Sequence, residues 1–125
     1  MRILIADDEA NARRNLAELL ANHSEVEICG EADDGLSTLE KIKLLNPDVV
    51  LLDIQMPGMD GLEVARTLRA HPDPAVATVP IIAVTALAMP GDRERCLAAG
   101  ADAYVTKPVH LPDLVDLIQG LLQGT

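Results

Sequence analysis

Short apolar runs recur along the chain, and the two most regular of them stop at an aspartate. The run at residues 49–52 ends at Asp53, and the run at residues 3–6 ends at Asp7. Short unbroken runs rich in valine and isoleucine are typical of strands buried on both faces of a parallel sheet. An alternating pattern predicts an edge strand at residues 25–30, and two further runs predict strands at residues 79–85 and 103–106.

Between these runs, apolar residues recur at the spacing of an α-helix. The predicted helices are marked by Ala12, Leu16, Leu19 and Leu20; by Leu39, Ile42 and Leu45; by Leu62, Ala65 and Leu68; by residues 90–99; and by Leu114, Leu117, Ile118 and Leu121. The segment from His71 to Pro74 is predicted to be a loop. Strands that alternate with helices predict a doubly wound α/β fold of the (βα)5 type, with five parallel strands and helices on both faces.

Length and charge narrow the classes of protein that this chain could be. Its 125 residues suffice for one domain with a core, so residues 1–125 are predicted to form a single domain. The formal charge of −10 would repel a nucleic-acid backbone, so direct nucleic-acid binding is not expected. No apolar run predicts a membrane span, and the first residues do not resemble a signal peptide. Cys29 and Cys96 are expected to be reduced thiols of a cytoplasmic protein.

Several residues that could bind a ligand follow the ends of the predicted strands. In open α/β sheets, ligands bind at the edge where the carboxyl ends of the strands meet. That edge should collect Asp7, Asp8, Asp53, Thr85 and Lys107. Two like charges ~4 Å apart repel by about 4 kcal/mol at an effective dielectric near 20. The acids are therefore expected to raise a pKa or to bind a cation, and oxygen ligands of this kind suit Mg²⁺.

Lys107 and Thr85 add a positive charge and a hydroxyl donor to this group of acids. The combination predicts a phosphoryl site built around a metal ion, with Asp53 at the centre of the sheet as the candidate nucleophile toward phosphorus. Each residue alone has an ordinary structural explanation, such as a helix cap or a strand terminus. Their joint placement at the ends of strands favours the functional interpretation.

Five segments together resemble the receiver domain of two-component response regulators, the CheY-like family. These segments are Asp7-Asp8, residues 53–61, Thr85-Ala86, residues 98–102 and residues 104–108. The resemblance covers essentially the whole chain. It implies a flavodoxin-like fold in which the strand order is 2-1-3-4-5.

The resemblance also implies a role for each matched residue. Asp53 matches the aspartate that is phosphorylated, and the Mg²⁺ ligands are matched by Asp7, Asp8, Asp53 and the backbone carbonyl of Gln55. The groups that contact the phosphoryl oxygens are matched by Thr85, Lys107 and the N–H of Ala86. Tyr104 matches an aromatic residue that moves inward when Thr85 moves, and Pro108 matches a cis-proline.

These roles imply a signalling switch rather than an enzyme with an outside substrate. Asp53 would accept a phosphoryl group from a sensor histidine kinase or a histidine phosphotransfer protein, in a Mg²⁺-dependent reaction. Phosphorylation would change the surface formed by the helix at residues 90–99, the strand at residues 103–106 and the last helix, and so control an output protein or domain. A phosphorylation-dependent dimer is compatible with this scheme, and membrane binding is not expected.

Two other classes of protein share part of the pattern. A haloacid-dehalogenase-like phosphatase also uses an aspartate nucleophile, Mg²⁺, threonine and lysine, but it needs a second acid where this chain has Gln55. A flavodoxin-like nucleotide carrier shares the fold, but its first loop binds phosphate through N–H groups and hydroxyls, where this chain has acids at residues 7–9. Turnover of p-nitrophenyl phosphate would indicate the first class, and bound flavin would indicate the second.

Overall fold

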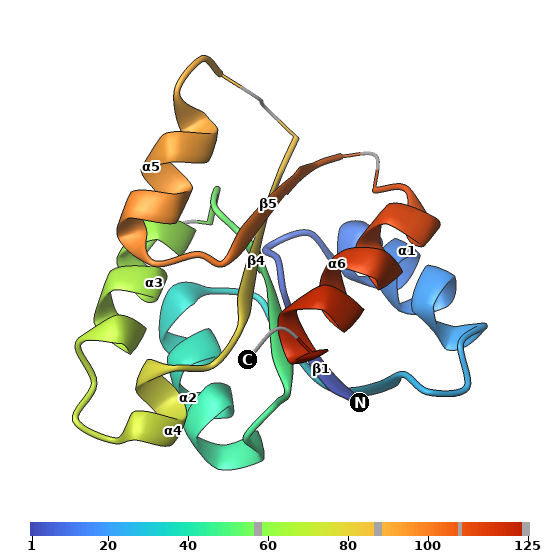
Figure 1. Cartoon of the computed structure of the whole chain (residues 1–125), viewed down its shortest axis with the longest axis horizontal. Coiled ribbons are helices and arrows are strands. Elements are labelled where there is room, and N and C mark those ends of the chain that lie inside the picture. The colour runs from blue at the N-terminus through green and yellow to red at the C-terminus, as the bar shows by residue number, and fades with distance from the viewer. Residues whose placement is uncertain (57–58, 87–88, 108, 124–125) are drawn as a thin grey trace.

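A five-stranded parallel sheet forms the centre of the structure, a computed structural model that describes residues 1–56, 59–86, 89–107 and 109–123. The strands are β1 (Arg2–Ala6), β2 (Glu27–Ala32), β3 (Val49–Asp53), β4 (Ile81–Thr85) and β5 (Ala103–Thr106). They lie in the order β2-β1-β3-β4-β5, and every neighbouring pair is parallel (Figure 1). The predicted fold class and strand order are confirmed.

Helices cover both faces of this sheet (Figure 1). They are α1 (Ala10–Ala21), α2 (Gly35–Leu45), α3 (Gly61–Arg69), α4 (Pro74–Ala77), α5 (Asp92–Ala99) and α6 (Leu111–Gln123). The helices α1 and α6 pack on one face, and α2, α3 and α5 pack on the other, so each face has its own apolar core. No helix in the described parts of the chain combines the length and the apolarity that crossing a bilayer requires.

The central strands β3 and β4 are buried along their whole length. Val50 and Leu52 of β3 face the core under α2, α3 and α5, whereas Val49 and Leu51 face the core under α1 and α6. The chain has no Phe or Trp, so aliphatic side chains fill most of both cores. Burying one such side chain contributes roughly 1.5–3 kcal/mol. Polar chemistry is therefore confined to the ends of these strands.

The strand β2 lies two residues later than the predicted strand at residues 25–30. Its pairing with β1 runs from Arg2 opposite Glu27 to Ala6 opposite Ala32. The N–H of Asp7 then donates to the carbonyl of Ala32 at 3.0 Å. The neighbouring strand sets this pairing, so the local alternation of apolar residues does not reveal where β2 ends.

A one-turn helix, α4, stands where the sequence predicts a loop. It begins at Pro74, whose fixed φ suits the first turn of a helix. The carboxylate of Asp73 accepts a hydrogen bond from the N–H of Ala75 at 3.0 Å and caps this turn. The expected loop is present at residues 71–73, but the prediction was wrong from Pro74 onward, because it treated proline only as a helix breaker. The predicted fourth and fifth helices are consequently α5 and α6.

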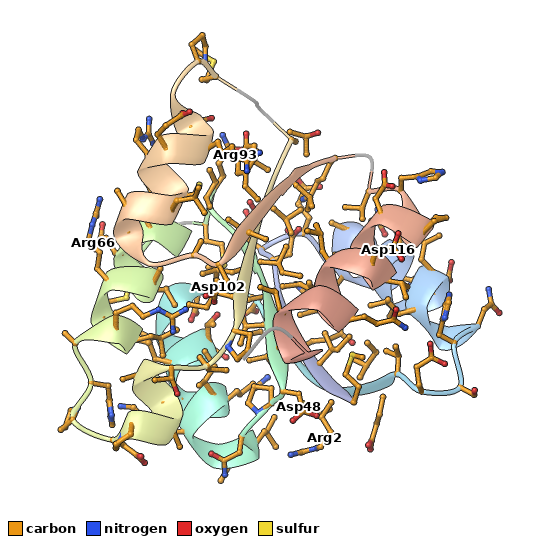
Figure 2. All side chains as sticks on the ribbon, in the orientation of Figure 1. Arg2, Asp48, Arg66, Arg93, Asp102 and Asp116 are labelled. Carbon is orange, nitrogen blue, oxygen red and sulfur yellow. The ribbon has the colours of Figure 1, made fainter. Side chains whose placement is uncertain are left out.

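Arg69 of α3 ties together the elements at the amino ends of the strands. Its guanidinium donates to the carbonyls of Ala77, Val79 and Gly100 at 3.0, 2.8 and 2.9 Å. It also forms an ion pair of 2.8 Å with Asp102, which is labelled in Figure 2. The charge of Arg69 is therefore matched within the fold, in contrast to the acids at the opposite edge of the sheet.

The two cysteines are free thiols, as the sequence predicts. Cys96 is buried and Cys29 is half-buried. Burial raises the pKa of both thiols, which disfavours the reactive thiolate at neutral pH.

Gly61 allows α3 to start directly against the end of β3. A Cβ at this position would lie 2.5 Å from the carbonyl oxygen of Asp53 and 2.6 Å from the Cα of Ile54. The N–H of Gly61 donates to the carbonyl of Ile54 at 3.2 Å. No side chain fits so close to this backbone, so the glycine helps to position the residue that ends β3.

We expect Gly61→Ala to lower the free energy of unfolding by about 2 kcal/mol, because the backbone of Asp53 and Ile54 must shift to admit the methyl group. Gly120→Ala in α6 is the matched control, since a Cβ there meets no atom within 4 Å. The control should leave stability unchanged or raise it by up to about 1 kcal/mol. Urea denaturation followed by circular dichroism measures both, and equal stabilities of the two variants would contradict the prediction.

Candidate functional site

Three aspartates meet at the carboxyl edge of the sheet. Asp7 and Asp8 follow β1, and Asp53 ends β3. One carboxylate oxygen from each residue lies within 4.8 Å of the other two. Asp7 and Asp53 are 1% and 6% exposed, whereas Asp8 is exposed. This group, called the acidic cluster below, therefore has a buried side and a side open to solvent.

Lys107, which follows β5, brings a positive charge to the acidic cluster. Its Nζ lies 2.7 Å from Asp7 Oδ2 and 3.6 Å from Asp53 Oδ2. The N–H of Lys107 donates to the carbonyl of Thr85 at 2.8 Å, and Thr85 ends β4 as a fully buried residue. Residues from the ends of four strands thus come together, as the argument from the sheet edge predicts.

Burial is the main cause of the unusual ionisation of Asp53, and it raises the pKa of this carboxyl to about 6. The N–H of Gln55, which donates to Asp53 Oδ1 at 2.9 Å, opposes the rise, as does the charge of Lys107, whereas Asp7 adds to it. Burial alone would lower the pKa of Lys107, but its hydrogen bond to Asp7 and the charge of Asp53 outweigh burial and raise that pKa. One ammonium therefore faces three acids, an arrangement that favours a cation.

The donor set of the acidic cluster fits Mg²⁺. It offers carboxylate oxygens and no nitrogen or sulfur ligand. Magnesium prefers oxygen ligands, keeps several of its waters and is usually bound through only a few protein carboxylates. The open side at Asp8 suits such a partly hydrated ion.

The remaining residues with predicted roles lie close to the same edge. Gln55 and Ala86 are exposed just beyond β3 and β4. Tyr104 of β5 is half-buried and packs against the core under α2, α3 and α5. It pairs with Ala83 of β4, and Thr85 is two residues further along that strand, so Thr85 points to the same face of the sheet as Ala83. The predicted cis-proline, Pro108, lies outside the described residues.

Arg13 of α1 also contacts the acidic cluster, and the sequence gives no indication of this. Its Nη1 donates to the backbone carbonyl of Asp7 at 2.7 Å, and its Nε donates to Glu31 Oε1 at 3.1 Å. Arg14 follows directly in the sequence, and no local pattern distinguishes the two arginines. Only the packing of α1 against the sheet decides which of them faces Asp7.

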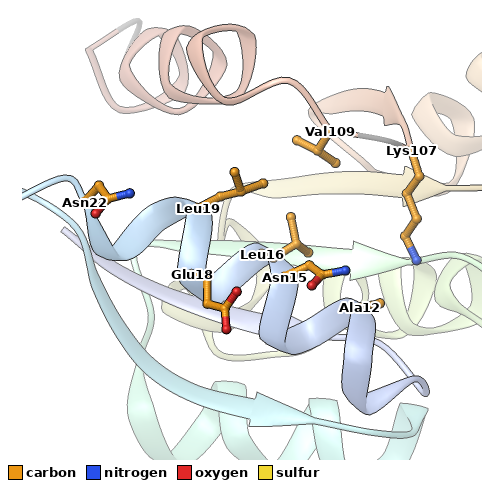
Figure 3. Close-up of a pocket in the computed structure, with 8 residues that line it drawn as sticks. All are labelled: Ala12, Asn15, Leu16, Glu18, Leu19, Asn22, Lys107 and Val109. Atoms are coloured by element: carbon orange, nitrogen blue, oxygen red, sulfur yellow. The ribbon is translucent and has the colours of Figure 1, made fainter.

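A groove of about 800 Å³ runs along α1 (Figure 3). It is lined by Ala12, Asn15, Leu16, Glu18, Leu19, Asn22, Lys107 and Val109. Leu19, which the sequence places on the buried stripe of α1, is 36% exposed because it borders this groove. Lys107 lines the groove and also contacts Asp7, so the groove and the acidic cluster adjoin at this residue.

Nearly all of the chain matches a known protein family. The family model of the response regulator receiver domain covers residues 3–119. This chain belongs to that family. It is a CheY-like receiver domain of two-component systems, and such domains are signalling proteins rather than classical enzymes. Members of the family bind Mg²⁺ at an acidic pocket, to which the acidic cluster corresponds.

Individual relatives agree with this assignment. Response regulator GacA of Pseudomonas viridiflava is 38% identical over 125 residues, which are 99% of this chain and 56% of that protein. Response regulator MprA of Mycobacterium leprae is 40% identical over 126 residues, which are 100% of this chain and 52% of that protein. The receiver domain therefore spans about half the length of these curated relatives.

Solved structures show the same likeness in three dimensions. The signal receiver domain of NarL from Mycobacterium tuberculosis has a TM-score of 0.88 at 32% identity, covering 99% of this chain and 97% of that one. The response regulator domain of Thermotoga maritima CheB has a TM-score of 0.85 at 28% identity, covering 98% and 96%. The likeness extends over the complete sheet and its helices.

The raised pKa of Asp53 predicts a dependence of stability on pH. Its ordinary value is 3.8 and its value in the folded domain is about 6, so between these pH values the folded state binds more protons than the unfolded state. Stability contributed through Asp53 is therefore present below about pH 4 and is lost as the pH rises through 6. We expect Asp53→Asn to be more stable than wild type at pH 7, by on the order of 2 kcal/mol, with little difference at pH 4.

Urea denaturation of both proteins between pH 4 and 7.5, without divalent cations, measures this difference. Asp116→Asn is the control, because Asp116 is an exposed acid on α6 (Figure 2). Its pH profile should run parallel to that of wild type. A constant stability difference between Asp53→Asn and wild type across this range would show that Asp53 titrates normally.

Proposed function

We propose that this receiver domain is a phosphorylation switch in which Asp53 accepts a phosphoryl group from a phosphohistidine. The donor would be a sensor histidine kinase or a histidine phosphotransfer protein. One observation carries the proposal: Asp53 lies close to Asp7, Asp8 and Lys107 at the carboxyl edge of the sheet. Membership of the receiver family supports it.

The transfer requires only one bond to form and one to break at phosphorus. An oxygen of the Asp53 carboxylate attacks the phosphorus atom, and the P–N bond to the donor imidazole breaks as the new P–O bond forms. The imidazole keeps the electron pair of the broken bond and takes a proton from solvent. Because Oδ1 accepts the hydrogen bond from Gln55, we assign the attack to Oδ2, which lies on the side of Lys107.

The neighbouring groups are suited to hold the charge of the transferred phosphoryl group. Mg²⁺ held by the three acids would neutralise part of that charge. Lys107 contacts Asp7 and lies near Asp53, so its ammonium gains a more strongly charged partner when Asp53 is phosphorylated. The hydroxyl of Thr85 and the N–H of Ala86 are the neutral donors that we assign to the remaining oxygens.

Thr85 and Tyr104 would carry the signal away from the acidic cluster. Thr85 ends β4, and Tyr104 lies beside that strand on β5. Movement of Thr85 toward the phosphoryl group would leave space into which the half-buried ring of Tyr104 can turn. This movement would shift a two-state equilibrium of the face made by α5, β5 and α6.

The same chemistry suggests where the switch operates and what reads it. We place it in the cytoplasm, where a histidine kinase has access to ATP. The charge of −10 favours basic partner surfaces and disfavours direct contact between this domain and nucleic acid. The altered face of α5, β5 and α6 would be read by an output protein or domain, or by a second copy in a phosphorylation-dependent dimer.

We expect wild-type protein to gain one phosphoryl group from acetyl phosphate with Mg²⁺, and Asp53→Asn to gain none, because an amide cannot act as the nucleophile. Intact-mass spectrometry measures the product, and EDTA should prevent its formation. Asp33→Asn is the control, since Asp33 is an exposed acid just after β2 at the same edge of the sheet. Labelling of Asp53→Asn at the wild-type level, or turnover of p-nitrophenyl phosphate, would contradict the proposal.

We expect Thr85→Ala to separate phosphorylation from the change in the output face, because it removes the hydroxyl assigned to the phosphoryl group. In wild type, beryllofluoride with Mg²⁺ should shift amide NMR signals around Asp53 and throughout α5, β5 and α6. In Thr85→Ala the signals near Asp53 should still shift, but those of α5 should not. Thr78→Ala, at the exposed end of α4, should behave as wild type; wild-type shifts in Thr85→Ala would exclude this route.

A further inference from the structure

Arg13 has no part in the proposed transfer of the phosphoryl group, yet it touches the backbone of the acidic cluster. We propose that Arg13 is a positioning residue that holds the peptide between Asp7 and Asp8 in the orientation needed to bind Mg²⁺. The inference rests on the proposed function, in which Asp7 and Asp8 are ligands of that ion. It concerns how the cluster keeps its shape rather than which atoms bind.

Hydrogen bonds hold Asp7 from several sides. Its N–H donates to the carbonyl of Ala32 at 3.0 Å, and its own carbonyl accepts from Arg13 at 2.7 Å. Its Oδ1 accepts from the N–H of Glu9 at 2.9 Å, and its Oδ2 accepts from Lys107 at 2.7 Å. Of these contacts, the one from Arg13 is made by a charged side chain to the backbone, so it fixes the peptide plane.

The orientation of this peptide matters most for Asp8. The carbonyl of Asp7 belongs to the peptide bond that leads into Asp8, so rotation of that plane would redirect the following carboxylate. Asp8 is exposed, and within the described residues its side chain makes no hydrogen bond or ion pair of its own. The direction of Asp8 therefore depends on its backbone, which Arg13 anchors from α1.

Glu31 in turn orients Arg13. Its Oε1 lies 3.1 Å from Arg13 Nε, and Lys41 donates to the backbone carbonyl of Glu31. The side chain of Arg13 is 18% exposed and that of Glu31 is 48% exposed. The planar guanidinium contacts two acceptors in different directions, which a lysine ammonium on a flexible stem cannot reproduce with the same geometry.

A purely electrostatic role for Arg13 would have the opposite effect on the metal. A positive charge beside a cation site repels Mg²⁺, so removing that charge alone would tighten binding. Removing a residue that positions the ligands would weaken binding, despite the loss of repulsion. The sign of the change in Mg²⁺ affinity therefore distinguishes the two roles.

The test is to titrate three proteins with Mg²⁺ by isothermal calorimetry: the wild-type domain, Arg13→Ala and Arg14→Ala. Arg14 is the matched control, because it carries the same charge one residue away and is exposed, and its side chain makes no hydrogen bond or ion pair among the described residues. We expect Arg13→Ala to bind Mg²⁺ roughly tenfold more weakly, a loss typical of residues that orient metal ligands. Arg14→Ala should bind as tightly as wild type or slightly more tightly.

Further measurements separate the positioning role from the effects of charge and of folding. They are the variant Arg13→Lys, the circular dichroism of each variant and the rate of phosphorylation. The lysine keeps the charge but lacks the planar fork, so we expect it also to bind Mg²⁺ more weakly than wild type. Circular dichroism at the titration temperature establishes that each variant is folded. At saturating Mg²⁺ the rate of phosphorylation by acetyl phosphate should return to within about twofold of wild type, because no reacting group has been removed.

The positioning role would be overturned if folded Arg13→Ala bound Mg²⁺ as tightly as Arg14→Ala or more tightly. This includes the case in which both variants bind Mg²⁺ more weakly than wild type by the same factor. A phosphorylation rate that stays low at saturating Mg²⁺ would also overturn it, since Arg13 would then act in the transfer itself. Failure of the wild-type domain to bind Mg²⁺ would overturn the proposed function as well. The wild-type titration thus separates the two failures.

Discussion

The ammonium of Lys107, held between two buried carboxylates, is the interaction on which the site depends. Because β1 and β3 are neighbours, the ends of these strands bring Asp7 and Asp53 together whatever their charges. Two like charges ~4 Å apart repel by about 4 kcal/mol at an effective dielectric near 20. Lys107 reaches across the end of β4 and offsets part of this repulsion, but one ammonium faces three acids, and burial together with the charge of Asp7 still raises the pKa of Asp53.

This incomplete balance makes the carboxyl edge responsive to a change in charge. The central strands β3 and β4 behind it are apolar on both faces up to their last residues, so these strands provide no charge with which the acids could pair. At the amino ends of the strands, Arg69 is matched by three carbonyls and Asp102. The charge at the amino edge of the sheet is thus matched, whereas the acids at the carboxyl edge still repel one another. Proteins commonly accept the loss of stability that such repulsion causes at a functional site.

Backbone contacts place the acids as firmly as side-chain contacts do. Gly61 allows the start of α3 to lie against the backbone of Asp53, and the N–H of Gln55 holds one oxygen of that carboxylate. On the neighbouring strand, Asp7 is held through its N–H, its carbonyl and both carboxylate oxygens. Asp8 remains exposed between these fixed points, so the open side of the cluster is also its least constrained part.

The sequence by itself determined the fold class, the strand order implied by the family motifs, and the meeting of Asp7, Asp53 and Lys107. These features depend on short apolar runs that are each followed by a polar residue. Because the carboxyl ends of parallel strands lie at the same edge of the sheet, these polar residues lie close together. The sequence did not reveal the late position of β2 or the short helix that starts at Pro74. The first depends on pairing with β1, and the second depends on a cap that competes with the tendency of proline to break helices.

Only the tertiary structure distinguished Arg13 from Arg14, because the packing of α1 against the sheet decides which guanidinium meets the carbonyl of Asp7. The tertiary structure also determined the burial of Asp53, which is the main cause of the raised pKa of this carboxyl. Motif and spacing select the kinds of residue that a site needs. Burial, charge and hydrogen bonding among residues far apart in the chain decide what each of them does, and these are set only when the strands and helices pack together.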